Sequence, residues 1–139
     1  MNVVRKNSLT AEEKRAVGRL VDACNEYDRT EMGIYLGTEF NLYPEMNCYY
    51  LYIEDGRLIG FLSADVEEAG WADIKGCVLP ERRREGIFRR LYDCAREELA
   101  RFGVGRVNLV SQKSFVEGND FMPAFGAELH EEEFQMRYV

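Results

Sequence analysis

The chain has 139 residues, of which 46% are hydrophobic and 31% charged, and it carries a net charge of −7. This length suits a single core, so we expect residues 1–139 to form one domain. No apolar run is long enough to span a bilayer and the N-terminus turns polar at once, which argues against a membrane protein or a signal peptide and favours a cytoplasmic location. One histidine, no Cys-x-x-Cys pair and four widely spaced cysteines predict reduced thiols and no metal.

The first third of the chain predicts one helix and one ambiguous segment. Thr10 and Glu13 form a capping box, and apolar residues follow at helical spacing, which predicts a helix over residues 11–27. Residues 28–46 are ambiguous, because the apolar residues around 32–36 suggest a short second helix before a loop.

The remaining elements alternate between strands and helices. Asp55-Gly56 separates two apolar runs and predicts a hairpin. A helix begins after Gly86 and stops at Gly103, and its crossover length predicts that the strands on either side are parallel. A further short helix is expected over residues 119–125. The candidate strands are residues 1–4, 48–53, 57–66, 71–79, 106–111 and 128–139.

The stretch from the fourth of these strands into the helix predicts an anion site. Pro80 ends the strand, Arg82, Arg83 and Arg84 follow, and Gly86 opens the helix. Amides at a helix start have no acceptor within the helix and lie at the positive end of the helix dipole, so they suit a phosphate. The stretch contains neither a P-loop nor a Gly-x-Gly-x-x-Gly pattern, so a nucleotide kinase or a dinucleotide-binding domain is not expected.

Two motifs in this stretch resemble those of the GCN5-related N-acetyltransferases, the GNAT superfamily. Val78-Leu79-Pro80 matches the family's strand ending, and the run from Arg83 to Phe88 matches its coenzyme A loop, with Phe88 in place of a small residue. The resemblance implies a mixed α/β (α+β) fold: a central, mostly antiparallel sheet with splayed parallel strands, flanked by helices. It also implies an acetyl-CoA-dependent N-acetyltransferase. The closest likeness is to a bacterial subset that often has tandem GNAT domains.

The resemblance also implies roles for individual residues. Asp73 matches the position of the family's general base, and a main-chain amide near Val78 is the expected donor to the thioester oxygen. The residues implied to hold the coenzyme are Cys77, Val78 and Leu79 through their backbone, and Arg83, Arg84, Glu85, Gly86, Ile87, Phe88 and Arg89 in the loop.

The general acid is where the sequence departs from the family. Met122 stands where many members carry a Tyr, and Tyr92 on the central helix is of a kind that usually packs in a core. Ser111 and Ser114 are weaker candidates for contact with coenzyme or acceptor. Two hypotheses stay open: an active N-acetyltransferase, or a catalytically weak coenzyme A-binding or pairing module.

Charge separates the predicted partners. Residues 81–101 hold seven Arg against five acidic residues, a local charge of +2, so the remainder carries −9. An acidic body beside a basic loop suits a phosphorylated cosubstrate and an amine acceptor, either a small molecule or a protein, and argues against nucleic acid. Glu31, Glu39 and Glu45 either attract that amine or are ordinary surface carboxylates. The apolar strand predicted over residues 128–139 would leave an open edge, so we expect a homodimer or pairing with a second GNAT domain.

Overall fold

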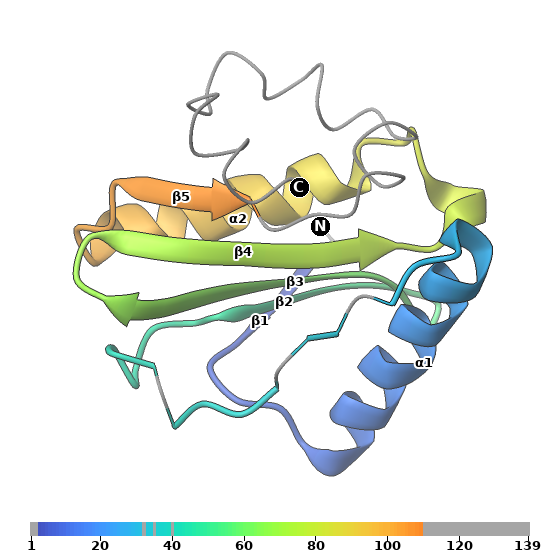
Figure 1. The fold of residues 1–139 in the computed structure, drawn as a ribbon, viewed down its shortest axis with the longest axis horizontal. Helices are drawn as coiled ribbons and strands as arrows, with labels where there is room; N and C mark the ends of the chain where they lie inside the picture. Colours follow the sequence, from blue (N-terminus) through green and yellow to red (C-terminus); the bar gives the residue numbers. More distant parts are fainter. Residues whose placement is uncertain (1–2, 32, 35, 40, 110–139) are drawn as a thin grey trace.

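The computed structural model describes residues 3–31, 33–34, 36–39 and 41–109. These residues form one sheet in the strand order β1-β2-β3-β4-β5, with a helix on each face (Figure 1). The first three pairings are antiparallel, and β4 and β5 are parallel as predicted. The mixed, mostly antiparallel sheet flanked by helices is therefore confirmed. The elements are β1 (Val3–Lys6), α1 (Ala11–Asp28), β2 (Tyr49–Glu54), β3 (Arg57–Glu68), β4 (Trp71–Val78), the 3₁₀ turn η1 (Pro80–Arg82), α2 (Ile87–Arg101) and β5 (Arg106–Leu109).

Helix α1 forms where its capping box predicts. The Thr10 hydroxyl accepts a hydrogen bond from the Glu13 amide at 3.1 Å, and the Glu13 carboxylate accepts one from the Thr10 amide at 2.8 Å. The helix ends at Asp28 and is capped by Arg29, whose amide donates to the Asn25 carbonyl from a left-handed backbone (φ 58). Both ends of the helix are thus satisfied locally.

The β2–β3 hairpin also follows its sequence signal. Asp55 and Gly56 both have positive φ, 52 and 76, as the two central residues of a type I′ turn require. The turn places Glu54 opposite Arg57, and a β-bulge between Tyr52 and Ile53 then shifts the register by one residue, so that Tyr49 lies opposite Ser63.

The strand registers gather polar side chains on one face of the sheet. Ser63 lies opposite Lys75, Asp65 opposite Asp73, and Asp73 beside Asn108. Directly paired residues share a face and alternate residues of one strand return to it, so these five side chains lie on the same side.

Different segments cover the two faces. Helix α1 packs on the polar side chains' face, where the Cys24 thiol interacts with that of Cys77. The segment between α1 and β2 crosses the same face, since the Tyr49 hydroxyl donates to the Gly37 carbonyl at 3.0 Å. Helix α2 packs on the opposite face, where a Cβ added to Gly60 would come within 3.1 Å of Ile87.

Some boundaries differ from those the sequence predicts. The first strand lies at Val3–Lys6 rather than at residues 1–4. The described residues between positions 31 and 39 are not helical, so the short helix suggested there is not observed in them. The short helix at 119–125, the strand at 128–139 and the splay of the parallel strands beyond Leu109 lie outside the described residues.

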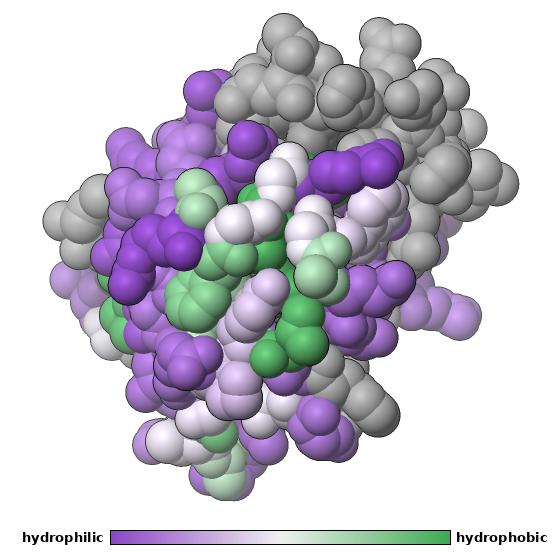
Figure 2. Space-filling model, turned by 90° about the vertical axis from the view of Figure 1, so that its left-hand side faces the viewer, coloured by the Kyte–Doolittle hydropathy of each residue, from purple (hydrophilic) through white to green (hydrophobic). Residues whose placement is uncertain are grey.

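One end of the molecule carries apolar surface. Figure 2 views the end at which β4 begins and α2 finishes, and apolar residues gather in its middle with hydrophilic residues around them. Tyr43 and Phe102 pack at this end with ring centroids 5.2 Å apart, and Leu42 is 44% exposed. Within the described part of the chain, no helix is long and apolar enough to cross a membrane.

Candidate active site

The loop between β4 and α2 has the backbone that the sequence predicts for an anion site. Gly86 caps α2 in a left-handed conformation (φ 80), and the first bond within the helix joins the Arg90 amide to the Gly86 carbonyl at 3.1 Å. The amides of residues 87–89, in the first turn of the helix, therefore have no acceptor within the helix and are directed past its N-terminal end. A Cβ built on Gly86 would meet no atom within 4 Å, so a ligand has room to approach the main chain there.

Arg83 holds the loop to the body of the protein. Its guanidinium donates to both oxygens of Asp28 at 2.8 and 2.9 Å, and its Nε donates to the Val78 carbonyl at 3.0 Å. Both side chains of this ion pair are only 9% exposed. Burial disfavours the charged guanidinium, but the hydrogen bonds and charge of Asp28 outweigh it and raise the pKa of Arg83. Arg83 is therefore a structural tether, and its predicted contact with a coenzyme remains untested.

Arg82 is also engaged within the protein. It donates to Glu54 at the hairpin at 2.7 Å and to Glu85 in the loop at 3.1 Å. The three arginines differ in exposure: Arg84 is exposed, whereas the side chains of Arg82 and Arg83 are 26% and 9% exposed. Of the arginine triplet, Arg84 is thus the most accessible to an incoming anion.

The backbone of β4 divides between its two neighbouring strands. The Leu79 amide donates to the Ile59 carbonyl at 2.9 Å, and Cys77 lies opposite Phe61 in the same ladder. Because backbone groups alternate between the two edges of a strand, Val78 is directed towards the β5 side. Its carbonyl already accepts from Arg83 and from the Cys24 thiol, the latter at 3.4 Å. Cys77 and Leu79 pair with β3 through their backbones. Of the three backbone amides at residues 77–79, that of Val78 is therefore the best placed to donate a hydrogen bond to a ligand.

Phe88 fits at the start of α2 because the residue of β4 that its ring packs against is Gly76, which has no side chain. Phe88 is 4% exposed, and a Cβ added to Gly76 would lie 2.7 Å from the Phe88 ring and 2.4 Å from the Phe61 carbonyl. The ring thus fills space that other side chains at position 76 would need. The bulky residue at position 88 packs into the core rather than over the loop, and Ile87 beside it is equally buried.

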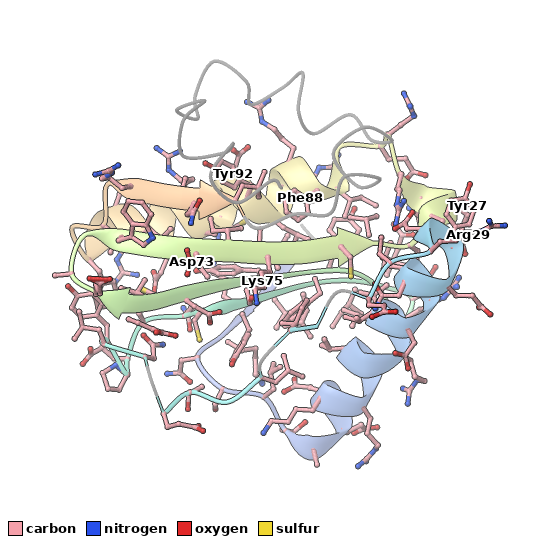
Figure 3. All side chains as sticks on the ribbon, viewed as in Figure 1. Tyr27, Arg29, Asp73, Lys75, Phe88 and Tyr92 are labelled. Atoms are coloured by element: carbon pink, nitrogen blue, oxygen red, sulfur yellow. The ribbon has the colours of Figure 1, made fainter. Side chains whose placement is uncertain are left out.

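Asp73 is held in place by two donors. Its Oδ1 accepts from the Trp71 indole at 3.3 Å and from the Asn108 amide at 3.2 Å. Figure 3 shows Asp73 and Lys75 on the side of β4 away from Phe88 and Tyr92 of α2. The carboxylate is only partly buried. A fixed, accessible carboxylate of this kind can accept a hydrogen bond or a proton from an amine.

Asp65 is a second carboxylate that the sequence did not single out. It lies directly opposite Asp73, and burial raises its pKa to about 6, with Asp73 and Glu67 adding to the shift and Lys75 opposing it. Its influence extends to β2, because Asp65 contributes, after burial, to raising the pKa of the Cys48 thiol. No sequence pattern marks Asp65, since an Asp in an alternating strand usually faces solvent.

Two buried oxygens beside these carboxylates have no partner among the described residues. Ser63 is fully buried and its Oγ makes no hydrogen bond, and the same holds for Oδ1 of Asn108, which is 1% exposed. The Asn108 amide nitrogen donates to Asp73, so its oxygen is turned away from that carboxylate. Buried polar atoms without partners are rare and cost free energy, so each calls for an explanation.

Comparison with protein-family models identifies the family of this chain. A family model described as the acetyltransferase (GNAT) family matches residues 14–122. The chain belongs to the GNAT acetyltransferase family. Membership makes the protein an acyltransferase.

Solved structures of GNAT proteins share the fold at low sequence identity. An acetyltransferase from Staphylococcus aureus Mu50 superposes with a TM-score of 0.71 at 11% identity, over 91% of this chain and 81% of that one. A GNAT acetyltransferase from Brucella melitensis, solved with acetyl-CoA, gives 0.60 at 16% identity over 89% and 80%. The ribosomal-protein-S18-alanine N-acetyltransferase of Escherichia coli gives 0.58 at 16% identity over 90% and 73%. A search of curated proteins finds no match.

The other residues singled out in the sequence differ in where the structure places them. Tyr92 is buried on α2 and accepts a hydrogen bond from Arg96 at 2.9 Å, as a packing residue would. Glu31, Glu39 and Glu45 are all exposed. Met122, Ser111 and Ser114 lie outside the described residues. No group of three or more metal-ligating side chains is found in the described part of the chain.

Proposed function

We propose that this protein is an acetyl-CoA-dependent N-acetyltransferase that moves an acetyl group directly to an amine, and that residues 1–139 form one GNAT domain. The observation that carries the proposal is the left-handed Gly86 at the start of α2, with open space where a side chain would stand. Backbone donors at a helix start, beside Arg84, suit the pyrophosphate of coenzyme A.

Two residues of β4, which leads into this loop, are proposed to act in the transfer itself. The Val78 amide is the proposed donor to the thioester oxygen, where negative charge develops as the amine attacks. Asp73, on the same strand, is the proposed acceptor for the amine's N–H. The amine nitrogen forms its bond to the acetyl carbon, the carbon–sulfur bond breaks, and the thiolate takes a proton from water, since Met122 has none to give. The acetyl group is supplied by the cosubstrate.

The binding proposal is tested with a pair of matched glycine variants. Gly70 has the same left-handed backbone as Gly86 (φ 80 for both) and the same open space, but lies in the turn between β3 and β4. Gly86→Ala and Gly70→Ala therefore carry a similar conformational cost of about 1 kcal/mol. We expect calorimetry to show at least tenfold weaker coenzyme A binding for Gly86→Ala and parental binding for Gly70→Ala. Equal binding by both variants would show that the loop is not the coenzyme site.

Activity is tested by thiol release from acetyl-CoA over a panel of amines. A parental chain that binds coenzyme A but releases no thiol with any amine would favour the coenzyme-binding module over the enzyme. Thiol release that depends on an added amine supports transfer.

We also propose that the chain associates with a second copy or a second GNAT domain. The proposal rests on the apolar sequence of residues 128–139, which lie outside the described residues. We expect light scattering to show association that is lost when residues 134–139 are deleted. A monodisperse monomer before and after the deletion would contradict it.

A further inference from the structure

We propose that Asp28 is a positioning residue for acetyl transfer, which acts through Arg83 to hold the end of β4 so that the Val78 amide faces the thioester oxygen. This inference rests on the proposed function, because it takes the Val78 amide as the donor to that oxygen. It adds a residue of α1 to the site, whereas none of the site residues expected from the sequence lies on that helix.

The end of β4 is paired on one side only within the described part of the chain. β5 pairs with β4 from Trp71 to Ile74, and beyond Ile74 no described residue pairs with β4 on that side. β3 pairs with β4 as far as Val78, and the Leu79 amide still donates to the Ile59 carbonyl at 2.9 Å. A strand end that is held along one edge can twist about that edge, so its outward-facing groups need a second anchor.

Arg83 supplies this second anchor at the Val78 carbonyl. Its Nε donates to that carbonyl at 3.0 Å, and the Cys24 thiol of α1 donates to the same oxygen at 3.4 Å. Two donors can occupy both lone pairs of a backbone carbonyl. The oxygen of Val78 therefore repels less strongly the negative charge that would develop on a thioester oxygen beside it.

Asp28 determines where the guanidinium of Arg83 lies. Its two carboxylate oxygens accept from the two terminal nitrogens of Arg83 at 2.8 and 2.9 Å, which leaves Nε directed at Val78. Both side chains of the pair are nearly buried, so water screens their attraction little. The planar guanidinium fork holds both partners in one fixed geometry, which the ammonium of a lysine could not do.

Asp28 also keeps Arg83 from turning towards the coenzyme. Arg83 precedes Gly86 in the loop where the pyrophosphate is proposed to bind, and an unpaired guanidinium would be attracted to those phosphates. Such a turn would remove Nε from the Val78 carbonyl. Loss of Asp28 should therefore slow the transfer without weakening coenzyme A binding, whereas loss of a purely structural contact in the loop would weaken both.

Arg82 provides a matched control in the same turn. It anchors the turn to the β2–β3 hairpin through Glu54 at 2.7 Å and also donates to Glu85 in the loop. Glu54→Gln thus weakens the hold on the turn without removing a donor from the Val78 carbonyl. We expect this variant to keep the kcat of the parent.

The first experiment observes Val78 directly by NMR. The dipeptides Cys77-Val78 and Val78-Leu79 each occur once in the sequence, so carbon-13 on the carbonyl of the first residue and nitrogen-15 on the second resolve the Val78 amide and carbonyl. In the free protein, Asp28→Asn should shift the Val78 carbonyl signal and Glu54→Gln should not. In the parent, acetyl-CoA should move the Val78 amide proton further downfield than coenzyme A does, and Asp28→Asn should lose most of that difference.

These signals separate two kinds of failure. If acetyl-CoA and coenzyme A shift the Val78 amide equally in the parent, Val78 has no part in the proposed reaction and the role of Asp28 falls with it. If the difference persists in full in Asp28→Asn, only the role of Asp28 is wrong and the proposed function stands.

The second experiment measures turnover with an amine found in the thiol-release screen. For Asp28→Asn we expect kcat to fall roughly 10–10²-fold, as misplacement of a reacting group does, with the coenzyme A affinity in calorimetry unchanged. Because this variant leaves a buried charge unpaired, the double variant Asp28→Leu/Arg83→Met is measured beside it, since apolar replacement of a buried ion pair often preserves stability. The double variant should fold, bind coenzyme A as the parent does and transfer as slowly as Asp28→Asn. A parental kcat in the double variant, or a fall in kcat matched by equally weaker coenzyme A binding, would overturn the proposal.

Discussion

Replacing Asp65 with Asn should stabilise the protein at neutral and alkaline pH. Its pKa is raised from an ordinary value of 3.8 to about 6, mainly by burial. A group whose pKa is higher in the folded state contributes stability that is complete below the unfolded value and is lost as the pH rises through the folded value. A shift of about two units corresponds to roughly 3 kcal/mol, present at pH 4 and absent at pH 8. Asn cannot ionise, so the variant avoids this loss.

The assay is thermal unfolding of parent and variant across this pH range. A difference of about 3 kcal/mol should raise the Tm of Asp65→Asn above the parent by roughly 5–10 °C at pH 8 and by little at pH 4. Carboxylates remote from Asp65 titrate equally in both proteins and cancel in the difference. Asp22→Asn, the same substitution at an exposed position on α1, is measured beside it as the matched control. A Tm advantage independent of pH, or a loss of stability at pH 8, would refute the reasoning.

Three further outcomes can be measured directly. Asp28→Asn should destabilise the protein by about 3–5 kcal/mol in urea unfolding, because it leaves the buried Arg83 guanidinium unpaired, and a smaller loss would mean that water reaches the pair. Gly76→Ala should destabilise the protein, because the added Cβ would lie 2.4 Å from the Phe61 carbonyl as well as against the Phe88 ring. Adding Phe88→Ala removes only the ring, so it should not restore stability, and a double variant as stable as the parent would contradict this explanation. Asp73→Asn should lower turnover while leaving the coenzyme A affinity measured by calorimetry unchanged. Weaker coenzyme A binding by this variant would show that Asp73 belongs to the coenzyme subsite rather than to the acceptor subsite.

The fold was predictable where local chemistry alone decides the structure. Thr10 and Glu13 cap α1 through their own side chains, and Asp55-Gly56 adopts the positive φ values of a tight turn without help from distant residues. The residues around 32–36 carry apolar side chains that also suit a helix. The described residues of this region, 33–34 and 36–39, are not helical, and the Gly37 carbonyl instead accepts a hydrogen bond from the Tyr49 hydroxyl of the sheet.

For the candidate site, the sequence predicted the backbone conformation of the loop before α2 but not which side chains pair with one another. Gly86 and the helix start follow from the sequence, because a glycine before an amphipathic run has few other uses. The partners of Arg83 and the alignment of Asp65 with Asp73 depend on which strands and helices meet, and composition says nothing of strand register. The sequence therefore suggested an exposed arginine cluster and one carboxylate, where the structure has a buried tether and a carboxylate pair.

The strand order of the sheet also bears on how the protein folds. The five described strands lie side by side in the order in which they occur along the chain, so each pairs with its neighbour in sequence. The β2–β4 meander closes only short turns, which costs little loop entropy, whereas β5 must await α2 before it can pair with β4. We expect the meander to gain protection from hydrogen exchange early in refolding, with β5 docking afterwards. The loop proposed to bind coenzyme A lies between β4 and α2, so it would take its final shape only after β3 and β4 have paired.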